Sequence, residues 1–505
     1  MRGIQAAAAS AAIVVFGSGW AAQAQTAPGG GARTPDVGAR ATITVGGPTV
    51  CTSIVDFFTT SCQVSAYGVR FYGWVNLGAT YQTNGAPHDN QFANGLTYFP
   101  QKMNNGGRFQ LASDPFGASF VGLQIQEPLA NGWSFVAQLE ASFDPTSLTP
   151  ASGPGSLRDA VGVPLGQAKG VSDGSLNGQF YNSLGFLGLS SDTFGTVTLL
   201  RQGTLMRDAT IAYDPIPAYA FSLVSATGPI SGGGDTQNVR ETTAVKYRLS
   251  AGDWRFAVFG QAGGYRDGNS AKGTVEASVG ADFRIGAGVL STDVIAGHTK
   301  DAVSEALTGF AVDPNTGLGI ASSAATGVAA TISDNTNVMA VAKYTAQRLT
   351  LYGGYEWMQF ANPRDPVTSF TDISGFAFPV TGATSISNTG FPRDKILQVA
   401  WTGFRYNLTS SLDLVGAYYH YWQNDYSNGA ATAGSGGRTT CAVIATAVSS
   451  CAGAQDAVSA VLDWQFAPKW DTFVGTMYTR LNGGLDAGFL ARDNWATTAG
   501  VRLRW

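Results

Sequence analysis

The sequence has few charged residues for its length. Charged side chains make up only 13% of the 505 residues, whereas a soluble globular protein devotes about a quarter of its residues to charge. The formal net charge of −4 is too small to attract nucleic acid or an acidic substrate. The composition therefore differs from that of a soluble enzyme. The net charge does not indicate a charged partner.

The sequence also lacks long apolar runs. Beyond the first residues, none approaches the roughly 20 residues that a membrane-spanning helix requires. If the chain resides in a membrane, it must cross it as a closed β-barrel, because only helices and closed barrels satisfy every backbone polar group in lipid. Its abundant residues, 65 Gly with 28 Phe, 18 Tyr and 11 Trp, favour one large closed architecture.

The first residues have the pattern of an export signal. Arg2 gives a positive start, residues 6–17 form a weakly apolar stretch, and 22–24 read as a small-x-small cleavage site. We therefore predict a signal peptide over 1–24; a buried N-terminal helix is the alternative. Residues 25–66 are Gly-, Pro- and Thr-rich at their start, and we expect an extension there, which leaves 67–505 for the barrel.

Cysteine and histidine are scarce, with 4 and 3 residues. The cysteines form two close pairs, Cys51 with Cys62 and Cys441 with Cys451. Because an exported chain meets an oxidising environment, we expect two local disulfides. A metal site is the competing interpretation, but no histidine lies near either pair and zinc-type spacing is absent. We expect no metal and no other cofactor.

From Tyr67 onward, apolar and polar residues alternate in stretches of about ten, as they do in barrel strands. In the first stretch, Val69 and Phe71 fall on one face, and Arg70 and Asn76 on the other. Similar stretches lie near 117–126, 132–144, 180–190, 195–203, 241–249, 253–263, 273–286, 287–297, 336–347, 348–358, 394–407, 410–422, 455–466, 470–481 and 493–505. We predict an all-β fold, a 16-stranded antiparallel transmembrane barrel; 18 strands are the alternative.

The connections between these stretches are alternately short and long. Residues 128–131 and 191–194 are short connections, whereas 145–179 and 204–240 are long. Outer-membrane barrels have tight periplasmic turns and long extracellular loops, so the alternation places both termini, and the extension over 25–66, in the periplasm. A soluble sandwich or propeller has no reason to alternate in this way. Sixteen strands also leave a water-filled interior.

Several segments, in order, resemble the general porins of Gram-negative bacteria. Residues 69–73 resemble their first strand, and 122–123 with 138–140 their second and third. Residues 194–202 with Asp208 are the most specific match, and 499–504 fit the last strand. The resemblance implies a homotrimer in the outer membrane, in contact with its lipid and lipopolysaccharide, that lets small hydrophilic solutes and ions diffuse passively.

In that family the third long loop folds into the barrel and narrows it, with acids on the loop facing arginines on the wall. The resemblance implies that this loop is 204–240, with Asp208 and Asp214 on the loop and Arg201 and Arg240 on the wall. Opposed charges across a wet constriction set a transverse field that orients polar solutes.

The row of arginines is thinner here, because Phe120 and Ser183 stand where the family usually has arginine. We therefore expect a weaker field and less anion preference. Strict alternation with Leu199 would place Arg201 on the lipid face, where an arginine costs about 2–4 kcal/mol at the bilayer midplane. We expect a bulge, or an early end of the strand, just before Arg201; a charge at the membrane interface is the alternative.

The strand pattern also assigns residues to the two faces of the wall. Arg70, Asn76, Glu140 and Glu356 fall on the lumen face, and we predict them as lumen-wall residues; for the two glutamates, a wetted wall acid without a specific role is the simpler interpretation. The last residue, Trp505, falls on the outer face, and we expect it in the interfacial aromatic girdle.

Two other functions compete. A barrel hydrolase would need a nucleophile and a base, but His420 stands among aromatic residues and no recognisable nucleophile motif accompanies it. We therefore expect no enzymatic activity. A channel selective for sugars or anions is the second, and the 11% aromatic content offers it some support, although most aromatics fit interfacial girdles.

Overall fold

The computed structural model describes residues 50–85, 88, 97–100, 105–148, 181–227, 240–262, 271–308, 310–312, 319–321, 327–364, 385–387, 393–426, 451–486 and 489–505. The chain divides into two compact units, 1–33 and 34–505, and all that follows concerns the second. The predicted signal peptide over 1–24, residues 25–49 of the predicted extension, and Cys441 lie outside the described residues.

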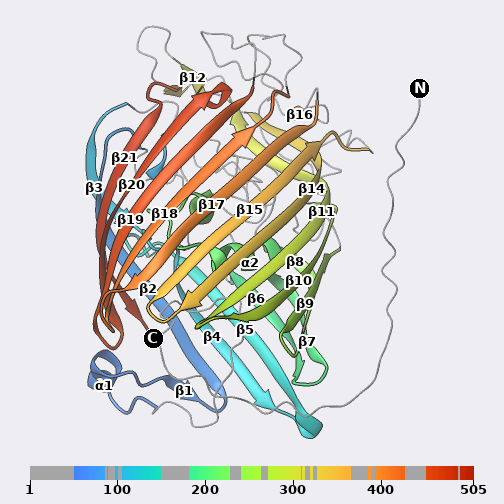
Figure 1. Cartoon of the computed structure of the whole chain (residues 1–505), viewed down its shortest axis with the longest axis vertical. Coiled ribbons are helices and arrows are strands. Elements are labelled where there is room, and N and C mark those ends of the chain that lie inside the picture. The colour runs from blue at the N-terminus through green and yellow to red at the C-terminus, as the bar shows by residue number, and fades with distance from the viewer. Residues whose placement is uncertain are drawn as a thin grey trace. The chain divides into compact units, whose positions relative to one another are not determined.

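The fold is a closed antiparallel barrel of sixteen wall strands (Figure 1). The wall strands are β2 (Val69–Gln82), β3 (Arg108–Ser113) with β4 (Ser119–Pro128), β5 (Trp133–Phe143), β6 (Leu184–Ser191), β7 (Gly195–Gly203), β8 (Arg240–Ala251), β9 (Trp254–Gln261), β10 (Gly273–Ile285), β11 (Gly288–Thr308), β14 (Gly327–Ala346), β15 (Leu349–Ala361), β17 (Lys395–Asn407), β18 (Leu412–Gln423), β19 (Gly453–Ala467), β20 (Trp470–Gly483) and β21 (Asp493–Arg504). Every predicted stretch coincides with one of them, and the sixteen-strand prediction is confirmed.

The barrel closes because β21 pairs with both β20 and β2. The β2–β21 register runs from Trp74 opposite Arg504 to Gln82 opposite Ala496. Short turns join the strands at one end and long connections join them at the other, which makes the short-turn end the periplasmic one in outer-membrane barrels. None of the helices in the described part of the chain is long and apolar enough to span a membrane.

The second wall strand consists of two pieces. β3 pairs with residues 77–82 of β2, and β4 pairs with residues 69–74 of the same strand. Residues 114–118 separate β3 from β4. Asn76 holds this break: its side chain donates to the carbonyl of Gly117 at 2.7 Å and accepts from the amide of Phe116 at 2.9 Å. The predicted stretch began near 117, so β3 was not predicted.

The bulge expected before Arg201 is present. The β7–β8 register shifts between Leu200 and Gln202, and Leu200 adopts a φ of 82°. Leu199 and Leu200 are consequently both exposed on the outer face, at 40% and 50%, while Arg201 is 5% exposed. The extra residue turns the arginine away from lipid, as the energetic cost of an outward charge requires.

Aromatic side chains ring the outer face at the short-turn end. Trp133 stacks on Phe194 with ring centroids 5.8 Å apart, and Trp254 lies 6.4 Å from Phe283. Trp505 continues the outer face of β21 and lies 5.7 Å from the ring of Phe71 on β2. Aromatic belts of this kind mark the membrane–water interface of barrels.

The described part of the N-terminal extension lies at this same end, beside the C-terminus in Figure 1. It contains α1 (Ile54–Thr59), β1 (Val64–Ala66) and the predicted disulfide Cys51–Cys62, which is confirmed. β1 pairs with β2 directly below the end of β21, with Val64 opposite Phe71. The short elements β12 (Phe310–Val312), β13 (Gly319–Ala321) and β16 (Ser385–Ser387) lie in the long connections.

Candidate functional site

The connection after β7 folds into the barrel. It contains α2 (Leu205–Tyr213) and α3 (Leu223–Thr227). The Thr204 side chain caps α2 by accepting from the amide of Arg207, and the helix ends at Asp214 just before Pro215. Residues 204–227 therefore form the inward-folded third loop that was predicted, and we call them the constriction loop; residues 228–239 lie outside the described part.

The constriction loop packs its apolar side against the lumen face of β9 to β20. The loop contributes Leu205, Met206, Ile216, Phe221, Leu223 and Val224, and the wall contributes Phe259, Ile295, Met339, Met358, Leu397, Val399, Trp401, Val415, Phe473 and Met477. All of these side chains are buried. On this part of the wall the loop covers many apolar side chains of the lumen face, together with buried polar ones such as Glu276 and Glu356.

Polar contacts fix the path of the loop along the wall. Glu276 of β10 accepts from the amide of Leu205 at 2.5 Å, which places a carboxylate at the N-terminus of α2. Trp401 donates to the carbonyl of Tyr213 at 3.1 Å, and Ser459 of β19 donates to the carbonyl of Phe221 at 2.5 Å. The loop thus follows the wall from β10 around to β19.

The two acids predicted on the loop do not face open water. Asp208 accepts from Lys246 of β8 at 2.7 Å and forms an ion pair with Arg248 of the same strand. Arg207 of the loop itself also lies within ion-pair distance of this carboxylate, at 3.9 Å. The acid of the loop is neutralised by direct contact with the wall.

Asp214 is buried at the turn after α2. Its carboxylate accepts from Ser222, Ser225 and Tyr419 at 2.5, 2.5 and 2.7 Å, and from the amide of Ile216 at 3.1 Å. Burial raises the pKa of Asp214 to about 6, and these hydrogen bonds oppose the shift. Asp214 therefore holds the loop to β18 through Tyr419.

The wall arginines come together with an arginine of the loop. Arg240 is close enough to Arg201 and Arg207 for the three positive charges to interact. Arg201 donates through Nε and Nη2 to the carbonyl of Asn182 at 2.9 and 2.8 Å. Tyr219 of the loop lies beside them: burial raises its pKa, while Arg240 and Arg207 oppose the shift. We call Arg201, Arg207 and Arg240 the arginine cluster.

The predicted lumen-wall residues differ in their access to the lumen. Arg70 is partly exposed and lies opposite Gln124 in the register. Asn76 is buried under the break at 114–118, and Glu356 of β15 is also buried. Glu140 is also buried; Tyr72 donates to it at 2.9 Å, so it is part of a wall network.

The two positions where arginine was expected have other roles in the wall. Phe120 lies 5.5 Å from the ring of Tyr72 and 5.6 Å from that of Trp74, which makes an aromatic patch on the lumen face. Ser183 donates its hydroxyl to Glu140. Neither position brings charge to the lumen.

Sequence reasoning missed Arg207, Lys246 and Arg248. Helical periodicity over 205–213, with apolar residues at 205, 206, 209 and 213, was a signal that could have identified α2 and placed Arg207 on its polar side. No comparable signal identifies Lys246 and Arg248 as the partners of Asp208. That pairing depends on where the loop meets the wall.

A separate polar group lies on the outer face near the long-loop end. His420 and Tyr418 both bind Asp456, each at 2.7 Å, and the His420 ring stacks on Trp422 at 5.0 Å. Within the described ranges, no group of His, Cys, Asp and Glu side chains could hold a metal ion. The Cys441–Cys451 disulfide stays a prediction, because Cys441 lies outside those ranges.

No protein-family model matches the sequence, and no protein of curated function matches it. The fold does match solved structures. The anion-selective porin from Comamonas acidovorans is 13% identical, with a TM-score of 0.52 over 86% of this chain and 99% of that one. OmpT, an outer membrane protein of Vibrio cholerae, in a form lacking loop L8, is also 13% identical, with a TM-score of 0.50 over 86% of this chain and 99% of that one. This likeness shows the shared barrel fold.

Proposed function

We propose that this protein is a porin of a Gram-negative outer membrane, a water-filled channel through which small hydrophilic solutes and ions diffuse passively. The observation that carries the proposal is the division of the lumen. The constriction loop covers the cluster of apolar side chains on the wall from β9 to β20, while the wall from β2 to β8 keeps polar side chains such as Arg70 and Gln138 partly exposed. A sixteen-stranded barrel is wide enough to leave an aqueous passage beside such a loop.

The outer face supports the same location. Valine, leucine and phenylalanine side chains are exposed there on strand after strand, for example Val197, Phe256, Val338, Phe404 and Val474. A soluble protein rarely exposes so much apolar surface, whereas a lipid-facing barrel wall must. Contact with outer-membrane lipid and lipopolysaccharide, and assembly as a homotrimer, belong to the proposal through the resemblance to the general porins.

The charges beside the passage favour anions. Asp208 and Asp214 are held by direct contacts, and the arginine cluster brings three positive charges together beside the polar wall. A ring of positive charge at a constriction lowers the barrier for anions and raises it for cations. With Phe120 and Ser183 in place of two arginines, the preference is expected to be modest.

Reconstitution in a planar bilayer tests the proposal. We expect large stepwise conductances that tolerate many solutes, and a reversal potential in a salt gradient that corresponds to anion preference. Absence of conductance would refute the channel. Block of the current by one sugar class or one anion class alone would favour the alternative, a substrate-selective channel. Cross-linking of purified protein in mild detergent tests the homotrimer.

A further inference from the structure

Helix α1 exposes apolar side chains at the periplasmic edge of the barrel. Ile54, Val55 and Phe58 are 70%, 64% and 40% exposed. At 3.6 residues per turn these three positions share one side of the helix, and Asp56 points to the opposite side. There the Asp56 carboxylate accepts from the amide of Thr52 at 3.3 Å. Within the described part of the chain, Ile54 and Val55 keep most of their surface exposed.

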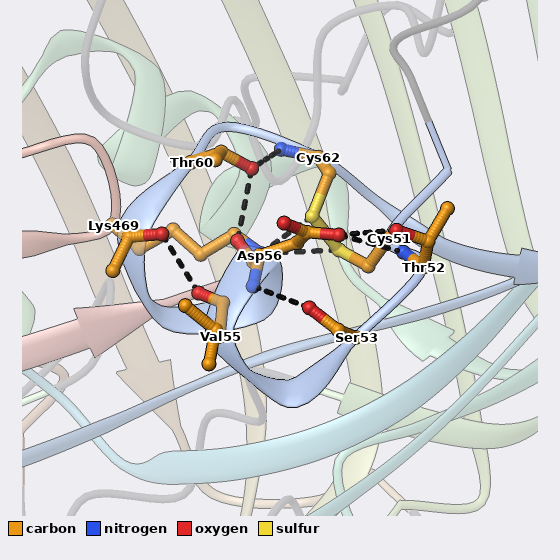
Figure 2. Close-up of a disulfide and its surroundings, with 9 residues drawn as sticks. Cys51, Thr52, Ser53, Val55, Asp56, Thr60, Cys62 and Lys469 are labelled. Carbon is orange, nitrogen blue, oxygen red and sulfur yellow. Dashed lines mark hydrogen bonds between the residues drawn. A yellow bond between two sulfur atoms is a disulfide. The ribbon is translucent and has the colours of Figure 1, made fainter.

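The disulfide and a lysine hold this helix in place. Cys51 and Cys62 close the segment around α1, and the amide of Cys51 donates to the carbonyl of Gln63 at 2.9 Å. Lys469, in the short turn between β19 and β20, extends its Nζ to 3.7 and 3.9 Å from the two sulfurs (Figure 2). The same Nζ lies 4.2 Å from the ring centroid of Phe57. The helix is therefore fixed to the rim of the wall.

The contacts of α1 are with the outer face of the barrel. Phe58 stacks on Trp470 with centroids 6.2 Å apart, and Phe57 lies 6.1 Å from Trp505. Both tryptophans share the face of their strands that carries exposed Val474 and Val501. Val64 of β1 is opposite Phe71 in the register, so it points to the same side. The apolar side of α1 is thus continuous with the lipid-facing surface.

We propose that residues 50–66 form a membrane-interface anchor, in which the apolar side of α1 inserts into the periplasmic leaflet among phospholipid chains just below the headgroups. The inference rests on the proposed outer-membrane location. Short amphipathic helices that lie in the interface plane bury their apolar side about 5–10 Å into the boundary between headgroups and chains. Residues 50–66 contain no Lys or Arg, so apolar insertion and not attraction to anionic headgroups supplies the binding.

Phospholipid is the occupant that the geometry favours over a second copy of the chain. The exposed Phe58 lies against Trp470 and its neighbour Phe57 against Trp505, two tryptophans on the outer face that the proposed outer-membrane location turns toward lipid. The disulfide-closed segment also lies against the outer face, so it does not occupy the lumen, and its anchoring leaves the passage open. Contact with a second copy becomes an outcome of the test.

Spin labels on the full-length disulfide-bonded protein test the anchor. None of the cysteines in the described part is free, so single introduced cysteines can be labelled: Ile54→Cys on the apolar side, and Thr59→Cys as the matched control on exposed α1 surface facing away from Ile54. Each protein is reconstituted in vesicles of phosphatidylethanolamine and phosphatidylglycerol. We expect label 54 to be at least about fivefold less accessible to a water-soluble nickel relaxant than label 59, and more accessible to oxygen.

Two results would overturn the anchor. Equal nickel accessibility at the two positions would mean that α1 stands in water. Protection of label 54 that persists in detergent micelles, together with spin–spin broadening that disappears on dilution with unlabelled protein, would mean that a second copy covers it. Conductance of the same preparations separates this inference from the channel itself: a normal channel with an exposed label 54 refutes the anchor alone, and a silent channel refutes the proposed function.

Discussion

The two parts of the lumen wall differ in how far their side chains are exposed, although the same alternation of inward and outward residues builds both. From β2 to β8 the lumen side carries polar residues, such as Arg70 and Gln138, that remain partly exposed. From β9 to β20 it carries buried side chains such as Phe259, Met358 and Trp401. The difference shows that inward-facing does not mean water-facing in a barrel of this width. A loop that folds inward converts part of the wall into the core of a globular protein.

The largest effect on the difference between the two parts of the wall is expected from removing an apolar side chain of the constriction loop. Phe221 is fully buried between Phe116 and Phe473, so Phe221→Ala should weaken loop docking by about 3–5 kcal/mol. We expect larger and noisier single-channel currents and faster proteolysis of the loop. Phe256→Ala on the outer face is the matched control, because Phe256 is exposed to lipid. Unchanged currents in Phe221→Ala would mean that the loop does not limit the passage.

The second prediction concerns Asp208, the acid that binds the constriction loop to β8 on the polar part of the wall. In Asp208→Asn, Lys246 keeps its charge while buried and loses its ion pair, which costs about 3 kcal/mol. We expect a less stable α2 and a reversal potential shifted further toward anions. Asp253→Asn, in the short turn between β8 and β9, changes the same charge away from the site. A shift of equal size in both variants would argue for a general charge effect.

The buried Asp214 makes the docking of the loop depend on pH. Its pKa is raised to about 6 in the folded protein, above the ordinary value of about 3.9, so the folded loop binds the proton more tightly than the undocked loop. Docking is therefore most stable below about pH 4 and loses about 2–3 kcal/mol as the pH rises to 6. Hydrogen exchange of residues 205–225 at pH 4 and pH 7 measures this. Asp214→Asn should abolish the dependence, and a dependence that survives would contradict the assignment.

The smallest expected effect concerns selectivity. Arg207→Ala removes one charge of the arginine cluster, from the loop side of the passage. Because water screens partly exposed charges, we expect the anion-to-cation permeability ratio to fall by only about twofold, or about 0.4 kcal/mol. Arg284→Ala, near the short turn after β10, removes the same charge outside the cluster. An unchanged ratio in Arg207→Ala would remove that residue from the passage.

The strands could be predicted from the sequence because lipid imposes the same requirement on every one of them. The outer face must be apolar, and the strand ends are marked by alternately short and long connections. Even the bulge at Leu200 followed from the cost of an outward Arg201. The start of the second strand could not be predicted, since Asp114 forms a turn that Asn76 holds through contacts distant in sequence.

The site was less predictable than the wall. Which lumen-facing side chains are wet depends on the path of the constriction loop, and that path is fixed by contacts such as Trp401 with Tyr213 and Ser459 with Phe221. These pairs are far apart in the sequence and carry no local pattern. The resemblance identified the inward-folded loop, and the roles that it implied for Arg201, Arg240, Asp208 and Asp214 stay predictions. The direct contacts of the two acids with the wall carry no local pattern in the sequence.

The pairing of β1 below the end of β21 also sets a limit on how the barrel can close. Trp505 exchanges backbone hydrogen bonds with Gly73, and two residues further along β2, Phe71 already pairs with Val64. If β21 slid by two residues toward the periplasm, Trp505 would need the backbone groups that β1 occupies. A slip in that direction would also misalign every side chain of β21 with its neighbours on β20. The β1–β2 hairpin, which turns at Tyr67 and Gly68, therefore blocks a slip of β21 in this direction and so limits the register in which β21 pairs with β2.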